Sequence, residues 1–404
     1  MKPLLLFVSL LLSAAPLSAQ NPLARIVAEN KAAFGPWADD PDGYEIQVLY
    51  TEVDRRADGS VRLTTHRWGA ADTSQYFYPA STVKMPAAIL ALQRINELGA
   101  TGLDPQTPLF HGTGTAPAAA PQTAVRTDSS AVSGLPSVAH YLRKIFLVSD
   151  NDAYNRLFEW LGPTYLNHAL QRAGIHGGRL QHRVGVGGFN TETHAWLNPV
   201  RFVNGYDTPL QLGERHDRYY DALPHVNGQQ RGVGYTTNAG ELVSEPFDFS
   251  HKNYLSVRNL HDMLVRVMIP EAVPEHHRFA LDSTDYALLR NAMGQRPRES
   301  PSPRYDKPDN YVKFWCFGDQ PDDTVIPTGL RIHNKVGWAY GYLTDAAYFT
   351  DEQSGREFFL VGTIHVNKNR IFNDGVYEYD EIGLPFFGEL GRAVLAYERR
   401  KRRK

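Results

Sequence analysis

Two side chains placed three residues apart could together carry out nucleophilic catalysis. Ser81 stands at the start of an apolar helix-like run, and Lys84 places an amine on the same helix face. A serine hydroxyl attacks a carbonyl readily only when a neighbouring base takes its proton. A free lysine, with a pKa of about 10.4, is protonated at neutral pH, so burial or a second cation must lower that pKa. The pair predicts acyl transfer through Ser81, with Lys84 as the base.

A second motif could supply the proton that a leaving group needs. The tripeptide Ser149-Asp150-Asn151 places a second hydroxyl and an amide before another helix-like run. The Ser149 hydroxyl could pass a proton to a leaving nitrogen, and the Asn151 amide could orient the amide of a substrate. We expect Ser149 to be catalytic and Asn151 to bind substrate.

A third motif, Lys335-Val336-Gly337, begins a strand-like segment. The Lys335 ammonium could lower the pKa of a facing lysine and attract a substrate carboxylate. Gly337 would let an extended substrate approach the strand closely. The backbone N–H groups of Ser81 and Trp338 are the expected oxyanion hole.

Each of these motifs alone also has an ordinary structural explanation. A serine three residues before a lysine occurs by chance, Ser-Asp-Asn is a common start of a helix, and Lys-Val-Gly suits a strand end. Their order, each at the start of a suitable element, favours one shared site. The sequence predicts no metal or cofactor, because its 15 His form no His-Glu-x-x-His motif. The only cysteine, Cys316, lies among aromatic residues, and we expect a buried, inert thiol.

The elements that must position these motifs follow from the spacing of apolar residues. Strands near both chain ends flank a long helical middle, which predicts an α+β or three-layer arrangement with one sheet covered by a helical lobe. Residues 177–253 have little helical period and are expected to form loops with short strands, and residues 296–312 a surface connection. Helices are expected at 21–34, 82–98, 138–148, 152–161, 164–173, 255–269, 283–293 and 382–397, and strands at 44–50, 61–68, 342–349 and 358–366, with another from 332.

Composition excludes several classes of function. Of the 404 residues, 42% are hydrophobic and 21% are charged, and the net charge is −2. This balance is typical of a globular protein with a real core, and it indicates no nucleic-acid partner.

The first residues have the pattern of a secretory signal peptide. Met1-Lys2 gives a positive start, residues 4–15 are almost wholly apolar, and small residues precede an expected cleavage after Ala19. A membrane anchor is the alternative, but about 12 apolar residues are short against the ~20 of a spanning helix. We therefore expect a secreted or periplasmic protein without stable membrane insertion. The basic residues of 398–404 are expected to form a solvated tail.

Together the three motifs resemble those of the penicillin-recognising serine enzymes, and most closely those of the class A β-lactamases. Residues 77–80, 149–157 and 341–345 resemble that branch beyond the motifs themselves. The resemblance implies an antiparallel sheet of about five strands backed by terminal helices, an all-helical lobe, and a site at their junction. It also implies a small-molecule β-lactam or a cell-wall peptide as substrate.

The resemblance covers roughly residues 22–198, 255–295 and 332–397 of one domain spanning 22–397. Residues near 199–253 and 296–331 are left as insertions. The first is rich in Tyr and His and could form an aromatic lid over the cleft, although plain surface elaboration is the alternative. A monomer is the expected state.

One departure from the family pattern concerns the release of the acyl group. Class A enzymes carry a Glu four positions before an Asn that follows Leu, and that Glu activates the releasing water. Leu197-Asn198 matches this pattern and makes Asn198 an expected substrate-binding residue, but His194 stands at the position of the Glu. Glu192 could serve if the loop is longer, and a plain surface acid is the alternative.

The second departure is Val336, where the family has a Thr or Ser that donates to a substrate carboxylate. Losing a charge-assisted hydrogen bond of about 1.5–3 kcal/mol would weaken β-lactam binding roughly tenfold or more. Three hypotheses stay open: β-lactam hydrolysis, a D-Ala-D-Ala-type peptidase or esterase acting on cell-wall fragments, and a penicillin-binding sensor that stays acylated.

Overall fold

The computed structural model of the chain describes residues 21–71, 74–116 and 122–401. The expected signal peptide at 1–19 and the end of the basic tail lie outside these residues. Within the described ranges, no helix combines the length and the apolar character that a membrane crossing requires.

The central element is a five-stranded sheet in the order β12-β13-β14-β1-β2, with every neighbouring pair antiparallel. Strands from both chain ends meet in it, as the sequence predicts. The middle strand β14 is buried from Phe358 to Ile364 because both faces of the sheet are covered, and this stretch is a nearly continuous apolar run. The strands are β1 Gln47–Arg55, β2 Val61–Gly69, β12 Leu330–Ala339, β13 Tyr342–Asp351 and β14 Arg356–His365.

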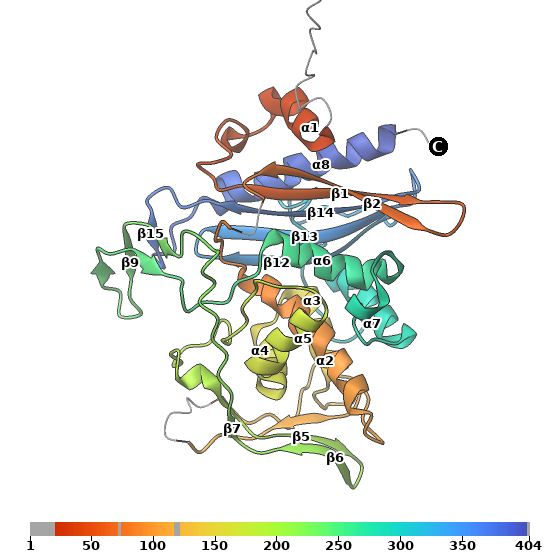
Figure 1. Cartoon of the computed structure of the whole chain (residues 1–404), viewed down its shortest axis with the longest axis vertical. Helices are drawn as coiled ribbons and strands as arrows, with labels where there is room; N and C mark the ends of the chain where they lie inside the picture. The colour runs from red at the N-terminus through yellow and green to blue at the C-terminus, as the bar shows by residue number, and fades with distance from the viewer. Residues whose placement is uncertain (1–20, 72–73, 117–121, 402–404) are drawn as a thin grey trace, which may run out of the picture.

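The two terminal helices, α1 (Pro22–Asn30) and α8 (Leu384–Arg400), lie side by side on the outer face of the sheet (Figure 1). A core rich in aromatic side chains fills the space between them and the sheet. Cys316 belongs to this core, and burial raises the pKa of its thiol to about 12. The expected burial of the Cys316 thiol is therefore confirmed.

The opposite face of the sheet carries the helical lobe (Figure 1). Helix α6 packs directly on the sheet, and α2 runs through the lobe with nearly every side chain buried, including Lys84. The expected α+β fold of three layers is confirmed. The helices are α2 Lys84–Leu98, α3 Val138–Val148, α4 Asn151–Leu161, α5 Pro163–Arg172, α6 Val257–Met268 and α7 Ser283–Gly294.

Residues 177–253 form loops with short strands, as predicted. The short strands pair in small separate sheets at the edges of the molecule. The strands of this segment are β4 Trp196–Leu197, β5 Val200–Asn204, β6 Asp207–Leu212, β7 Arg215–His216, β8 Gln230–Arg231, β9 Gly234–Thr236, β10 Leu242–Val243 and β11 Phe247–Asp248. Two strands from outside the segment join them: β3 Leu109–His111 pairs with β5, and β15 Ile371–Phe372 pairs with β9.

The expectation that residues 296–312 form a mere surface connection is wrong. Arg296, Asp309 and Val312 are buried. Asp309 accepts a hydrogen bond from the backbone N–H of Ile326 at 3.0 Å, and its other oxygen pairs with Arg298. Charge and proline suggested solvent exposure throughout, and Arg304 and Lys307 are indeed exposed, but Arg296 and Asp309 are buried and lie 3.6 Å apart.

Candidate active site

Ser81 lies in a single 3₁₀ turn, Ala80–Val83, that leads directly into α2. The N–H and the hydroxyl of Thr82 both donate to the Pro79 carbonyl, at 3.0 and 2.6 Å. Ala80 takes a φ of +46°, a left-handed conformation that costs energy in a residue with a side chain. This strained turn presents the half-buried Ser81 at the junction of the sheet and the helical lobe.

Gly337 brings the edge strand β12 against this turn. A Cβ at Gly337 would lie 2.4 Å from the Pro79 carbonyl oxygen and 3.3 Å from the Cβ of Ala80. Only a glycine therefore allows the strand to approach the Ser81 turn so closely. The glycine was expected to give room to a substrate, and the structure gives it this packing role.

Lys84 is completely buried, and its amine is held by the Ser-Asp-Asn motif. Lys84 Nζ donates to the Ser149 carbonyl at 2.5 Å and to Asn151 Oδ1 at 2.6 Å, and it lies 3.2 Å from Ser149 Oγ. Burial lowers the pKa of Lys84 to about 7, and the nearby Asp150 opposes this shift. A neutral amine can satisfy both short hydrogen bonds with its two N–H groups and keep its lone pair for a hydroxyl.

Lys335 completes this group from the sheet side. Lys335 Nζ donates to Ser149 Oγ and to the Val336 carbonyl, both at 2.8 Å. Burial and the neighbouring Lys84 hold the pKa of Lys335 well below its usual range. Ser149 has a φ of +57° at the end of α3, which turns its hydroxyl between the two lysines. The structure thus brings together Lys84, Ser149, Asn151 and Lys335, as the sequence predicts.

Ser81 and Trp338 line two adjoining pockets beside this cluster. The larger pocket, of about 440 Å³, also receives Asn151 and the aromatic rings of Tyr78, Tyr340 and Tyr377. Among the described residues, no hydrogen bond joins Ser81 Oγ to Lys84 or Ser149. Ser81 therefore faces the open pocket while the amine lies beneath it.

The smaller pocket has a volume of about 100 Å³, and one of its walls was not predicted from the sequence. Tyr311, Val312 and Phe314 line it together with Ser149 and Val336. These three residues come from the segment 296–331, which was expected to be an insertion without an assigned role.

Buried polar groups fasten this wall to the sheet. Asp345 accepts from the backbone N–H groups of Phe314 and Trp315, at 3.1 and 3.2 Å. Asn334 donates to the Val312 carbonyl and to Asp345, each at 2.8 Å. A buried acid within an apolar strand was the one sequence signal that could have pointed to this anchor.

The family model described as the β-lactamase enzyme family matches residues 45–397 of this chain. The chain belongs to that family. It is a β-lactamase-like serine hydrolase by this membership, and the matched range holds all three motifs and both expected insertions. No curated protein matches the chain.

Solved structures of β-lactamases and of PBP-A also align with this β-lactamase-family protein. A β-lactamase from Burkholderia vietnamiensis is 13% identical, with 94% of this chain and 97% of that chain covered and a TM-score of 0.49. A β-lactamase from Sphaerobacter thermophilus is 13% identical, with 93% and 97% covered and a TM-score of 0.46. A PBP-A mutant, solved as an acyl-enzyme complex with penicillin G, is 14% identical, with 93% and 97% covered and a TM-score of 0.44.

The structure places Glu192 apart from the Ser81 cluster. Its half-exposed carboxylate lies 3.1 Å from His216 Nε2 and 3.2 Å from Arg218 Nη1. Glu192 lines neither of the pockets that Ser81 opens onto. His194, at the position of the family Glu, accepts from the backbone N–H of Arg183 at 3.3 Å.

Glu192 and His194 belong to the loop of residues 183–198. The residues of this loop that line the larger Ser81 pocket are Val184 and Gly185. Gly185 has a φ of +57°, and a Cβ there would lie 2.1 Å from Asn151 Nδ2. Asn155 fixes the approach by bonding both the N–H and the carbonyl of Val184, at 2.9 and 3.0 Å. Because the backbone touches Asn151 here, no side chain could extend toward the pocket from position 185.

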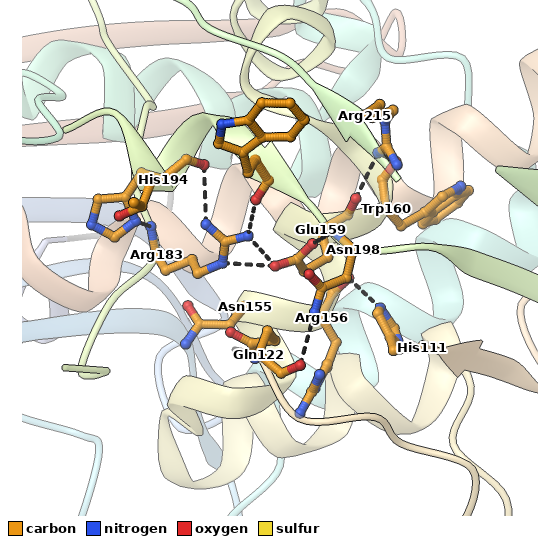
Figure 2. A network of polar contacts seen from close by, with 12 residues as sticks. His111, Gln122, Asn155, Arg156, Glu159, Trp160, Arg183, His194, Asn198 and Arg215 are labelled. Carbon is orange, nitrogen blue, oxygen red and sulfur yellow. Dashed lines mark hydrogen bonds and ion pairs between the residues drawn. The ribbon is translucent and has the colours of Figure 1, made fainter. Parts of the chain in front are cut away.

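A buried ion pair holds the rest of the loop (Figure 2). The Glu159 carboxylate pairs with the Arg183 guanidinium, and both side chains are fully buried. Arg183 also donates to the carbonyls of His194 and Trp196, at 3.0 and 2.7 Å. The Glu159–Arg183 pair was not predicted from the sequence, although an acid within an apolar helix face is a signal of burial.

Asn198 belongs to this network and not to the pockets around Ser81 (Figure 2). Its backbone N–H donates to Glu159, and its side-chain amide donates to the Gln122 carbonyl at 2.8 Å. The expected contact with substrate would require this buried side chain to leave its hydrogen bond with Gln122.

The Tyr residues of segment 199–253 surround a separate cavity. Tyr219, Tyr220 and Tyr235 line a space of about 540 Å³ between that segment and residues 181–195. None of them lines the Ser81 pockets. Of the two alternatives for this segment, the aromatic lid over the cleft is therefore not seen in this structure.

Proposed function

We propose that this protein opens an amide or ester through an acyl-enzyme on Ser81, with Lys84 as the general base. The observation that carries the proposal is the burial of the Lys84 amine between Ser149 and Asn151, one helical turn after Ser81. An amine with a pKa of about 7 is neutral in about half of the molecules at neutral pH, and the neutral form can accept a proton.

The proposed first step forms one bond and breaks another. Ser81 Oγ bonds to the substrate carbonyl carbon as its proton moves to Lys84, and the backbone N–H groups of Ser81 and Trp338 stabilise the oxyanion. The carbon–nitrogen or carbon–oxygen bond of the leaving group then breaks, and Ser149 relays the proton from Lys84 to the departing atom. Lys335 supports this relay through its hydrogen bond to Ser149 Oγ at 2.8 Å. Asn151 orients the acyl amide.

The second step, attack of water on the ester, is proposed to be slow for a β-lactam. None of the described residues lining the two Ser81 pockets is acidic or is a histidine, so no such side chain is placed to activate water. This favours a wall-peptide peptidase or esterase, or a penicillin-binding sensor, over a class A β-lactamase with rapid turnover. Glu192 serves as the base only if its loop rearranges away from His216 and Arg218.

Intact-protein mass spectrometry with penicillin G tests the acyl-enzyme. We expect wild type to gain the mass of one penicillin G and Ser81→Ala to gain none. Ser129→Ala, in an exposed turn outside both pockets, is the matched control and should be labelled like wild type. The proposal fails if wild type stays unlabelled after long exposure, or if Ser81→Ala is labelled equally.

We also propose that the protein acts as an exported monomer on a β-lactam-like or wall-derived small molecule. The positive start at Met1-Lys2, the apolar run at 4–15 and the small residues before Gln20 support export. Protein recovered from the periplasm or medium should begin at Gln20, and an intact Met1 would contradict cleavage.

A further inference from the structure

The two pockets beside Ser81 contain no charged side chain. Their lining consists of aromatic, aliphatic, hydroxyl and amide residues and glycine, in every case from the described part of the chain. The residues are Tyr78, Ala80, Ser81, Val148, Ser149, Asn151, Val184, Gly185, Tyr311, Val312, Phe314, Val336, Trp338, Ala339, Tyr340, Asn373, Gly375 and Tyr377.

The two lysines of the site lie beneath this surface, where they are hydrogen-bonded to the protein. Lys84 is fully buried and Lys335 is nearly so, and each directs its hydrogen bonds at protein oxygens. Both also have a lowered pKa, because burial disfavours their charged forms. A substrate carboxylate in either pocket would therefore have to break one of these bonds to reach a cation.

The charged residues next to the lining point elsewhere. Lys307 lies over the ring of Tyr311, 4.8 Å from its centre, and is not part of the lining. Asp374, between two lining residues, accepts from Asn369 at 2.7 Å and from the backbone N–H of Val376 at 2.9 Å. An acid at this rim would repel an anionic substrate.

Val336 offers no hydroxyl to an anion at the position where the family has a Thr or Ser. It is buried on β12 between Lys335 and Gly337, and it lines the smaller pocket with Val312 and Phe314. An apolar wall cannot replace the water that a carboxylate gives up on binding, so a charged group pays a desolvation penalty there.

From these observations we infer that the site selects uncharged substrates. The class is a neutral amide or ester with no carboxylate beside the scissile bond, and with an apolar or aromatic group for the walls formed by Phe314, Trp338 and Tyr340. The inference rests on the proposed acyl-enzyme at Ser81. It assigns a specificity role to Val312 and Phe314 of segment 296–331 and to Val336.

Penicillin G and its methyl ester form a matched pair of probes, because they differ only in the carboxylate. The acylation rate constant of each would be measured by intact-protein mass spectrometry on the full mature chain. Each value would be divided by the rate of reaction of the same compound with hydroxylamine, which corrects for intrinsic reactivity. We expect a corrected ester-to-acid ratio above one, and a ratio below one would overturn the inference.

Two variants show which group sets this ratio. Val336→Thr returns a hydroxyl to the wall, and it should lower the ratio by about tenfold, as expected of a charge-assisted hydrogen bond. Lys307→Met removes the cation over Tyr311 and should leave the ratio unchanged. A ratio that rises in Lys307→Met would identify Lys307 as a carboxylate partner and contradict the inference.

The same measurements distinguish a failure of the proposed acyl-enzyme from a failure of the inferred selectivity. If neither compound labels the protein at Ser81, the acyl-enzyme itself is rejected, and the selectivity for neutral substrates falls with it. If both label Ser81 and the acid reacts faster after correction, the acyl-enzyme stands and only the selectivity is rejected.

Discussion

At the scale of single residues, the protonation of Lys84 decides whether the site can work. Its two strongest hydrogen bonds use the two N–H groups that a neutral amine possesses. Burial lowers the pKa of Lys84 to about 7, and Lys84 in turn adds to the effect of burial in lowering the pKa of Lys335. This arrangement explains how a residue that is normally charged can act as a base at neutral pH.

The rate of acylation should therefore depend on pH. The lysine is active when neutral, so acylation should fall about tenfold per pH unit below about 7 and level off above it. Time courses of penicillin G labelling from pH 5 to pH 9 measure this directly. A rate that stays constant over that range would show that Lys84 is not the base.

Removing the amine should slow the chemistry without unfolding the protein. Lys84→Met keeps a long apolar chain in a buried position, and it should reduce the acylation rate by roughly 10²–10⁴-fold, the usual contribution of a general base. Lys307→Met, which lies outside the pocket lining, serves as the control and should react like wild type. Circular dichroism would establish that both variants keep their helices.

At the scale of elements, buried charges hold the loops that shape the pockets. Glu159 on α4 holds residues 183–198 through Arg183, and Asp345 on β13 holds the segment that carries Phe314. Both acids lie within elements that the sequence analysis had placed correctly. Their partners are distant in sequence, so neither pair could be read from local pattern.

Loss of one member of the Glu159–Arg183 pair should be costly. Glu159→Ala leaves a buried guanidinium without its counter-charge, and the free energy of unfolding should fall by about 3–5 kcal/mol. The double variant Glu159→Ala with Arg183→Met should recover part of this loss, since no unpaired buried charge remains. Urea unfolding of both variants tests this, and a double variant less stable than Glu159→Ala would contradict it.

Much of the fold was predictable because its elements have strong local patterns. The helix over 138–148 was predicted with its observed bounds, since Ser137 caps it and its apolar face is regular. The strand expected at 44–50 instead begins at Gln47, because Glu45 has a φ of +51° and breaks the extended backbone. The order of the strands in the sheet was not predicted, because local pattern contains no information on the pairing of strands that are distant in sequence.

At the scale of the whole molecule, the site was predictable only in part. The motif residues Lys84, Ser149, Asn151 and Lys335 were expected to meet, and they do so in one cluster. The wall around Val312 could not be predicted, because its place depends on long-range anchors and not on sequence spacing. The family spacing from Asn198 led to Glu192 as the candidate acid, but the structure places Glu192 outside the Ser81 pockets. The fold of this loop also depends on long-range contacts, which sequence spacing does not contain.

The uncharged cleft predicts a long-lived acyl-enzyme. With no acid or histidine among the described residues that line the Ser81 pockets, water should attack the ester slowly. The penicillin G adduct should persist for minutes or longer after free drug is removed, as followed by intact mass over time. Release within seconds would mean that an unassigned base activates water, and it would restore the β-lactamase hypothesis.

The central claim is that the acyl group bonds to one particular oxygen. Wild-type protein treated with penicillin G would be digested, and the modified peptide would be fragmented in a tandem mass spectrometer. The account predicts the added mass on Ser81 alone. An added mass on Ser149, on a lysine, or spread over several residues would contradict it.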